Sequence, residues 1–241
     1  MQYIYFIPIA TFTLSLVFSF VLWQHYRTKK EATYLLWWLI GVLTYGAGTF
    51  TESFNTLVGW KETNFRWWYI TGALLGGAPL AQGSVYLLMK KKTADRMTLA
   101  LVSLIVIASV SVLLAPIQYS LVEPERMSGK VFGWQWVRYF SPFINTYALF
   151  FLVGGAIWSA VAYFKKTGTG IRFWGNVLIA LGALLPGIGG SFTRLGYVEV
   201  LYVTEFVGLL LIMFAYRLMR KDARISIHAV QANLMEERQY A

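Results

Sequence analysis

The sequence predicts an all-α membrane protein, a bundle of seven transmembrane helices with the N-terminus outside and the C-terminus in the cytoplasm. Two observations predict this fold class: seven long apolar stretches, and an unequal distribution of Lys and Arg between the segments that join them. The 241 residues are 57% hydrophobic and only 13% charged, whereas a soluble domain usually carries about 25% charged residues. The apolar surface exceeds what one aqueous core could bury, so lipid is expected to solvate the rest.

The seven apolar stretches are each long enough to cross a hydrocarbon core of about 30 Å at a rise of ~1.5 Å per residue. They cover residues 3–25, 33–58, 67–89, 97–116, 139–164, 172–192 and 199–219. The joining segments are short apart from 117–137, so residues 1–221 are predicted to form a single transmembrane domain. Residues 222–241 are predicted to form a short cytoplasmic tail, for which an amphipathic helix and a frayed end are both open.

The basic residues are concentrated on one side of this arrangement. Of the 21 Lys and Arg, 6 fall on the side of the amino terminus and 15 on the other. Cytoplasmic segments retain Lys and Arg near the ends of transmembrane helices, so the richer side is expected to be cytoplasmic. The net charge of +10 then reflects membrane topology and attraction to anionic lipid, and no nucleic-acid partner is expected.

The first apolar stretch is predicted to be retained as a helix. Its positive charges follow the apolar residues, which is the arrangement of a reverse signal-anchor and not of a cleaved signal peptide. The implied partner is the lipid bilayer. We expect a multi-pass protein of the cell membrane, in the inner membrane of a bacterium or an archaeon.

Several kinds of chemistry are excluded by residue types that the chain lacks. It contains no cysteine, which excludes disulfides, thiolate catalysis and cysteine metal sites. His25 and His228 fall at or beyond the expected cytoplasmic edge, so paired-histidine haem ligation and histidine zinc sites are not expected. No lysine falls in the middle of a span, which excludes a retinal Schiff base. We predict no cofactor, no metal site and no catalytic residue.

Ionisable residues inside membrane spans are costly, so each is a candidate functional residue. Glu52 in the second span and Glu205 in the seventh are the clear cases, and both fall at similar depth in the outer leaflet. Asn55 lies one turn from Glu52 and is expected to face the same side. The candidate ligand- or ion-binding residues are Glu52, Asn55, Arg66, Tyr69, Arg138, Arg194 and Glu205.

Two interpretations of these candidates are open. The carboxyl groups of Glu52 and Glu205 could form the floor of an outward-facing polar crevice, suited to proton exchange or to binding a cation or an amine. They could instead form structural ion pairs, for example Glu52 with Arg66 or Glu205 with Arg138.

Other intramembrane residues are assigned to packing. Small residues allow close contact between helices. An intramembrane proline has no N–H, so a carbonyl of the preceding turn needs a hydrogen-bond donor from a neighbouring segment. The residues predicted to serve close packing or kinks are Gly72, Gly76, Pro79 and Pro186. For the prolines, kinks that line an internal crevice and simple tight packing are both open. Gln82 and Ser84 are expected to form hydrogen bonds between helices.

The segment 117–137 is the one long connection, and it ends in the aromatic residues Phe132, Trp134 and Trp136. A long loop among short ones is often a lid or a binding element. Tryptophans at the headgroup level of an interfacial loop are the alternative explanation.

The layout resembles the seven-helix amino-terminal sensor region of some bacterial membrane histidine kinases and related signalling proteins. The stretches that carry this resemblance are Trp38–Tyr45 through Glu52, Arg66–Ala73, Asn176–Pro186 and the acidic seventh span before Arg217. The resemblance implies a receptor-like role. Because a short tail is expected in place of a kinase or cyclase domain, it also implies a separate cytoplasmic signalling partner, which would bind the basic inner face and the tail.

Three functions follow from these expectations. The first is a receptor-like or accessory membrane protein that binds a small or lipidic ligand in the outer crevice and acts through a cytoplasmic partner. The second is a small transporter or proton-coupled carrier that uses the intramembrane carboxyl groups. The third is an intramembrane enzyme that uses the same groups. The sequence contains no pattern from which an oligomeric state can be predicted.

Overall fold

The computed structural model describes residues 2–124 and 126–239, without the side chains of Gln2, Arg194 and residues 224–239. Within these residues the chain is almost entirely helical and contains no β-strand. The α-helices are α1 (Ile7–Thr28), α2 (Thr33–Val58), α3 (Glu62–Trp68), α4 (Ala78–Leu88), α5 (Lys91–Leu114), α6 (Phe140–Ala148), α7 (Gly155–Thr167), α8 (Ile171–Arg194) and α9 (Val198–Gln239). Short 3₁₀ or π segments are η1 (Gln2–Phe6), η2 (Tyr69–Leu75), η3 (Tyr119–Leu121), η4 (Gly129–Val131), η5 (Gln135–Tyr139) and η6 (Leu149–Gly154).

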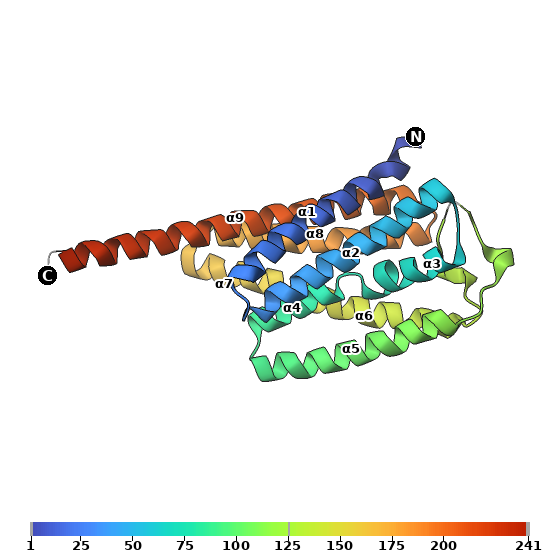
Figure 1. Ribbon diagram of the computed structural model, residues 1–241, viewed down its shortest axis with the longest axis horizontal. Helices are drawn as coiled ribbons and strands as arrows, with labels where there is room; N and C mark the ends of the chain where they lie inside the picture. The colour runs from blue at the N-terminus through green and yellow to red at the C-terminus, as the bar shows by residue number, and fades with distance from the viewer. Residues whose placement is uncertain (1, 125, 240–241) are drawn as a thin grey trace.

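The helices lie side by side in one elongated bundle (Figure 1). The N-terminus and the residues between α5 and α6 lie at one end, which we call the loop end. From the opposite end, which we call the tail end, α9 projects beyond the other helices (Figure 1). The central core packs α1, α2, α4 and α9 together through Phe18, Val42, Leu80 and Leu209.

Five helical stretches among the described residues are long and apolar enough to cross a membrane. They are Tyr3–Thr28, Lys91–Leu114, Gln135–Thr167, Ile171–Thr193 and Val198–Ala223. Less than two-fifths of the most apolar part of each is buried inside the bundle, which is consistent with contact between these helices and lipid. The chain is therefore a multi-pass membrane protein, and neither α2 nor the α3–α4 stretch is among the five helices.

The third predicted span is broken, which is a larger departure from helical geometry than a kink. Residues Tyr69–Leu75 form a π segment, and Gly76 then takes a φ of +44°, which favours glycine. Pro79 lies in the first turn of α4, where its missing N–H costs no hydrogen bond. The freed carbonyl of Ala73 accepts hydrogen bonds from the Ser141 hydroxyl at 2.6 Å and from Asn145 Nδ2 at 3.0 Å.

Pro186, in contrast, lies inside the continuous helix α8 and serves tight packing. A Cβ atom added at Gly208 of α9 would lie 3.2 Å from Pro186 Cδ and 2.5 Å from the carbonyl oxygen of Gly182. A Cβ atom added at Gly182 would lie 2.6 Å from the Gly208 carbonyl oxygen. The backbones of α8 and α9 therefore touch at this pair of glycines.

The expectation for Gln82 is confirmed, and the expectation for Ser84 is wrong. The fully buried Gln82 side chain donates to the Ala94 carbonyl at 3.2 Å and to the Thr98 hydroxyl at 2.7 Å, and it accepts a hydrogen bond from the Tyr147 hydroxyl. It thus joins α4, α5 and α6. The Ser84 hydroxyl donates to the Leu80 carbonyl of its own helix, at 3.4 Å.

The predicted tail is not a separate segment of the backbone. Helix α9 continues without interruption from Val198 to Gln239, over 42 residues. Residues 240–241 lie outside the described residues, and an amphipathic role for the tail stays a prediction.

Candidate functional site

The carboxyl groups of Glu52 and Glu205 meet near the loop end of the bundle. Helix α2 supplies Glu52 and helix α9 supplies Glu205, and the two side-chain carboxyl groups interact directly with each other. Glu52 is only 4% exposed. Glu205 is partly exposed as a residue, but its Oε2 atom is buried. The Oε2 atoms of both residues have no hydrogen-bond partner among the described residues.

The other polar groups around this carboxyl pair come from three helical segments. The Trp68 indole, at the end of α3, donates to Glu52 Oε1 at 3.1 Å. The Tyr45 hydroxyl, two turns before Glu52 on α2, donates to the backbone carbonyl of Glu205 at 3.0 Å. The Tyr202 ring, one turn before Glu205, is 5% exposed and lies within electrostatic reach of both carboxyl groups.

The ion pairs that the sequence suggested for these carboxyl groups do not form. Arg66 binds Glu62 instead of Glu52, with 2.7 Å between Nη2 and Oε1. Arg138 donates to Gln135 Oε1 at 2.7 Å instead of pairing with Glu205. Among the described residues, no Lys, Arg or His forms an ion pair with Glu52 or Glu205. Two charged carboxylates in contact repel each other, so the pair is suited to hold a proton or a positively charged group.

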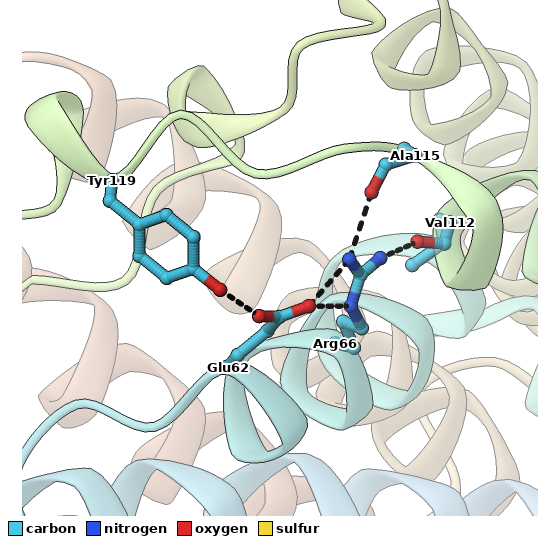
Figure 2. A network of polar contacts seen from close by, with 5 residues as sticks. All are labelled: Glu62, Arg66, Val112, Ala115 and Tyr119. Atoms are coloured by element: carbon cyan, nitrogen blue, oxygen red, sulfur yellow. Dashed lines mark hydrogen bonds and ion pairs between the residues drawn. The ribbon is translucent and has the colours of Figure 1, made fainter.

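Arg66 has a structural role, which Figure 2 shows. Its guanidinium forms hydrogen bonds with Glu62 and also donates to the carbonyl oxygens of Val112 at 2.5 Å and Ala115 at 2.8 Å. These carbonyls lie at the C-terminal end of α5, where a cation is favoured by the helix dipole. The Tyr119 hydroxyl completes the network by donating to Glu62 Oε2 (Figure 2).

This network predicts a pH dependence of stability at the loop end. Hydrogen bonds from Tyr119 and Arg66 hold the pKa of the Glu62 carboxyl below its usual value. A lowered pKa in the folded state means that the contribution of Glu62 to stability is present above the unfolded pKa of about 4.3 and is lost as the pH falls through the folded pKa. Glu62→Gln is therefore expected to lower the Tm at neutral pH, and the gap from wild type should close under acid conditions. Thermal unfolding at a series of pH values tests this, with Glu31→Gln as the exposed control. A gap that stays constant with pH would contradict it.

Asn55 connects α2 to the segment between α5 and α6. Its Nδ2 donates to the Pro124 carbonyl at 3.2 Å, while its buried Oδ1 has no partner among the described residues. Asn55 is 7% exposed. Asn55 therefore links the helix that carries Glu52 to Pro124 of the segment between α5 and α6.

The remaining predicted site residues serve other purposes. Tyr69 lies in an aromatic cluster, with its ring centroid 4.8 Å from that of Phe132 and 6.3 Å from that of Phe65. Gly72 allows a close approach of η2 to α2, because a Cβ atom added at Gly48 would lie 3.2 Å from Gly72 Cα. The side chain of Arg194 lies outside the described residues.

The segment between α5 and α6, which we call the loop layer (residues 115–124 and 126–137), is folded against the helices. Phe132 is fully buried against Phe65 and Tyr69. Trp134 and Trp136 stack on each other, with centroids 5.9 Å apart, and both remain exposed. The layer thus combines a packed inner side with two exposed tryptophans, and it covers the loop end of the bundle.

A cavity of about 470 Å³ lies between the loop layer, η1 and the start of α9. Its lining residues are Tyr5, Val122, Glu123, Pro124, Arg126, Gly196, Val198 and Glu199. The Tyr5 hydroxyl donates to Glu199 Oε1 at 3.1 Å. Sequence reasoning missed this site because its members come from three distant segments, although Glu123 and Glu199 could be recognised near the membrane surface.

The Tyr202 side chain lies between this cavity and the carboxyl pair. Its ring makes an edge contact with that of Tyr5, at 6.2 Å between centroids. Its hydroxyl is within electrostatic reach of Tyr5 and Glu199 as well as of Glu52 and Glu205. The cavity and the pair are thus adjacent parts of one polar region at the loop end.

Comparison with known proteins gives no relative that could assign a role to this region. No family model, no curated protein and no solved structure matches the chain.

Proposed function

We propose that the protein is a receptor-like or accessory integral membrane protein, in which the Glu52–Glu205 pair binds a cationic group that enters from outside. In this proposal all seven helical stretches span the membrane, with the loop end outside and the tail end in the cytoplasm. The charge distribution supports this orientation, because 15 of the 21 Lys and Arg fall on the cytoplasmic side. The resemblance to the sensor regions of membrane histidine kinases supports the receptor-like role.

The observation that carries the proposal is the contact between two buried carboxyl groups without a counter-ion among the described residues. Burying a charge is costly unless it is paired. Glu52 Oε2 and Glu205 Oε2 therefore gain from any donor that reaches them. An ammonium group supplies three N–H donors and one positive charge, so it matches a pair of carboxyl groups that hold one or two negative charges.

Helix α9 connects the carboxyl pair to the tail end of the protein. Glu205 lies on α9, a helix of 42 residues whose C-terminal part projects beyond the other helices (Figure 1). Near the tail end, Asp222 of α9 accepts a hydrogen bond from Arg172 of α8 at 3.3 Å. A cation bound between the carboxyl groups of Glu52 and Glu205 would change how α9 sits against α2, and a cytoplasmic partner bound to the tail would detect the change.

Glu205→Gln and Glu52→Gln test this proposal. Each is expected to abolish the rise in Tm that methylammonium or Na⁺ produces in the purified wild-type protein, because an amide in place of one carboxylate removes the charge that attracts the cation. Glu31→Gln, an exposed carboxyl at the tail end, is the matched control and should keep the wild-type response. Equal responses of all four proteins would overturn the proposed site.

A proton-coupled carrier is the second candidate, favoured by the continuity between the outer cavity, Tyr202 and the carboxyl pair. A row of neighbouring hydroxyl and carboxyl groups can pass protons between the outside and the bundle interior. Flux of a cation across proteoliposomes that disappears in Glu205→Gln would support the carrier over the receptor. Binding without flux would support the receptor.

A further inference from the structure

We propose that the cavity at the loop end binds a small zwitterion, in which an ammonium group is joined to an oxyanion. The proposal rests on the charges that line this cavity and does not depend on what the Glu52–Glu205 pair binds. A free amino acid or betaine has this chemistry, and so does the headgroup of phosphatidylethanolamine.

One side of the cavity is acidic. Glu199, at the start of α9, contributes a carboxylate that is oriented by the Tyr5 hydroxyl through a hydrogen bond of 3.1 Å. That bond occupies one oxygen of Glu199, so the other can accept from a ligand. Tyr5 also adds an aromatic face beside this carboxylate, and an aromatic face attracts an ammonium group.

The other side of the cavity carries a cation. The Arg126 side chain is 19% exposed, and its buried Nε has no hydrogen-bond partner among the described residues. Its contact with Glu123 is loose, at 3.7 Å between Nη1 and Oε2. The guanidinium fork matches the two oxygens of a carboxylate or a phosphate. A ligand oxyanion would bind the Nη atoms of Arg126 and replace the loose contact with Glu123.

The walls and the size of the cavity limit the ligand. Val122, Pro124 and Val198 give the walls an apolar character, and Pro124 is held in place by Asn55. The volume of about 470 Å³ is at the lower end of the range of roughly 300–1,000 Å³ that is usual for small-molecule sites. Opposite charges on two sides of such a space select a molecule that carries both charges close together.

Thermal unfolding in nanodiscs tests the proposal. It also distinguishes a soluble zwitterion from the headgroup of phosphatidylethanolamine as the ligand. In phosphatidylglycerol nanodiscs, which contain no zwitterionic headgroup, we expect L-alanine, glycine betaine or phosphoethanolamine to raise the Tm in a saturable way. Choline and acetate, which carry one charge each, should have no effect at the same concentrations. If the source is lipid, the soluble zwitterions have no effect, and nanodiscs with phosphatidylethanolamine raise the Tm instead.

Variants of the lining residues show whether binding in this cavity causes the rise in Tm. Glu199→Gln and Arg126→Gln should each lower the apparent affinity for the zwitterion by roughly tenfold or more. Each substitution removes a charged hydrogen-bond partner. Lys130→Gln removes an exposed positive charge of the same loop layer and should have no effect. If Arg126→Gln does not fold, Arg126→Lys serves in its place, because it keeps the charge and lacks the planar fork of the guanidinium.

The proposal is overturned if no zwitterion and no phosphatidylethanolamine nanodisc changes the Tm, or if the change persists in both cavity variants. It is also overturned if choline or acetate alone binds as tightly as the zwitterions. The carboxyl-pair test uses different probes and different variants, so either proposal can fail while the other stands.

Discussion

Gly208→Ala is expected to push α8 and α9 apart and to destabilise the protein. The added Cβ atom would lie 2.5 Å from the Gly182 carbonyl oxygen, and a backbone atom has no rotamer with which to move away. Overpacking in a well-packed interior typically costs about 1–3 kcal/mol, and a backbone obstacle places this substitution at the upper end of that range. Unfolding of the purified protein, followed by its circular dichroism, measures the loss.

Gly187→Ala is the matched control, because a Cβ atom at this position on α8 meets nothing within 4 Å. Alanine is the better helix former, so this variant should be as stable as wild type or more stable. Equal losses in Gly208→Ala and Gly187→Ala would mean that the glycine contact between α8 and α9 does not determine stability. Because Gly208 follows Glu205 by about one turn, Gly208→Ala is also expected to weaken cation binding at the carboxyl pair.

Arg66→Gln is expected to loosen the whole loop end. The substitution removes the bonds to Glu62 and leaves the carbonyl oxygens of Val112 and Ala115 without a charged donor. Hydrogen bonds to charged groups contribute about 1.5–3 kcal/mol each at most, and part of the network is exposed, so a loss of roughly 2–4 kcal/mol is expected. Arg66→Lys should fall between wild type and Arg66→Gln, since a lysine keeps the charge but cannot reach three acceptors as a planar fork.

Hydrogen exchange locates the effect of Arg66→Gln. Faster exchange is expected in the loop layer and at the C-terminal end of α5, and unchanged exchange at the tail end. Arg138→Gln is the control, because its hydrogen bond to Gln135 is exposed. If the two variants exchange alike, the network in Figure 2 does not hold the loop layer in place.

Most of the helical stretches could be predicted from apolar composition alone. The second predicted stretch, 33–58, coincides with α2 (Thr33–Val58), and the fourth and sixth begin or end within a few residues of α5 and α8. The third stretch was predicted as continuous, and its break could not be derived. Gly76 and Pro79 mark a weak point in the sequence, but the donors that make a break tolerable come from Ser141 and Asn145, far along the chain.

The candidate site was predictable in part. Glu52 and Glu205 were selected because they are the clear ionisable residues inside the predicted spans. The suggested partner Arg66 was wrong, although a local signal existed: Glu62 lies four residues before Arg66, which is the spacing of an ion pair within one helix. The zwitterion cavity depends on how the loop layer folds against η1 and the start of α9, and no spacing in the sequence encodes that contact.

The hydrogen bonds to Ala73 have a consequence for how the chain enters the membrane. Helix α2 is not among the helices that are long and apolar enough to cross a membrane, and the break at Gly76 leaves the helical pieces Glu62–Leu75 and Ala78–Leu88 too short to cross one alone. An unsatisfied carbonyl in lipid costs several kcal/mol. Ser141 and Asn145, which satisfy Ala73, are synthesised about seventy residues later. In the proposed seven-span arrangement, the Ala73 carbonyl therefore gains these hydrogen bonds only after α6 has been synthesised. Stable insertion of the third segment then depends on a helix that is made later in translation.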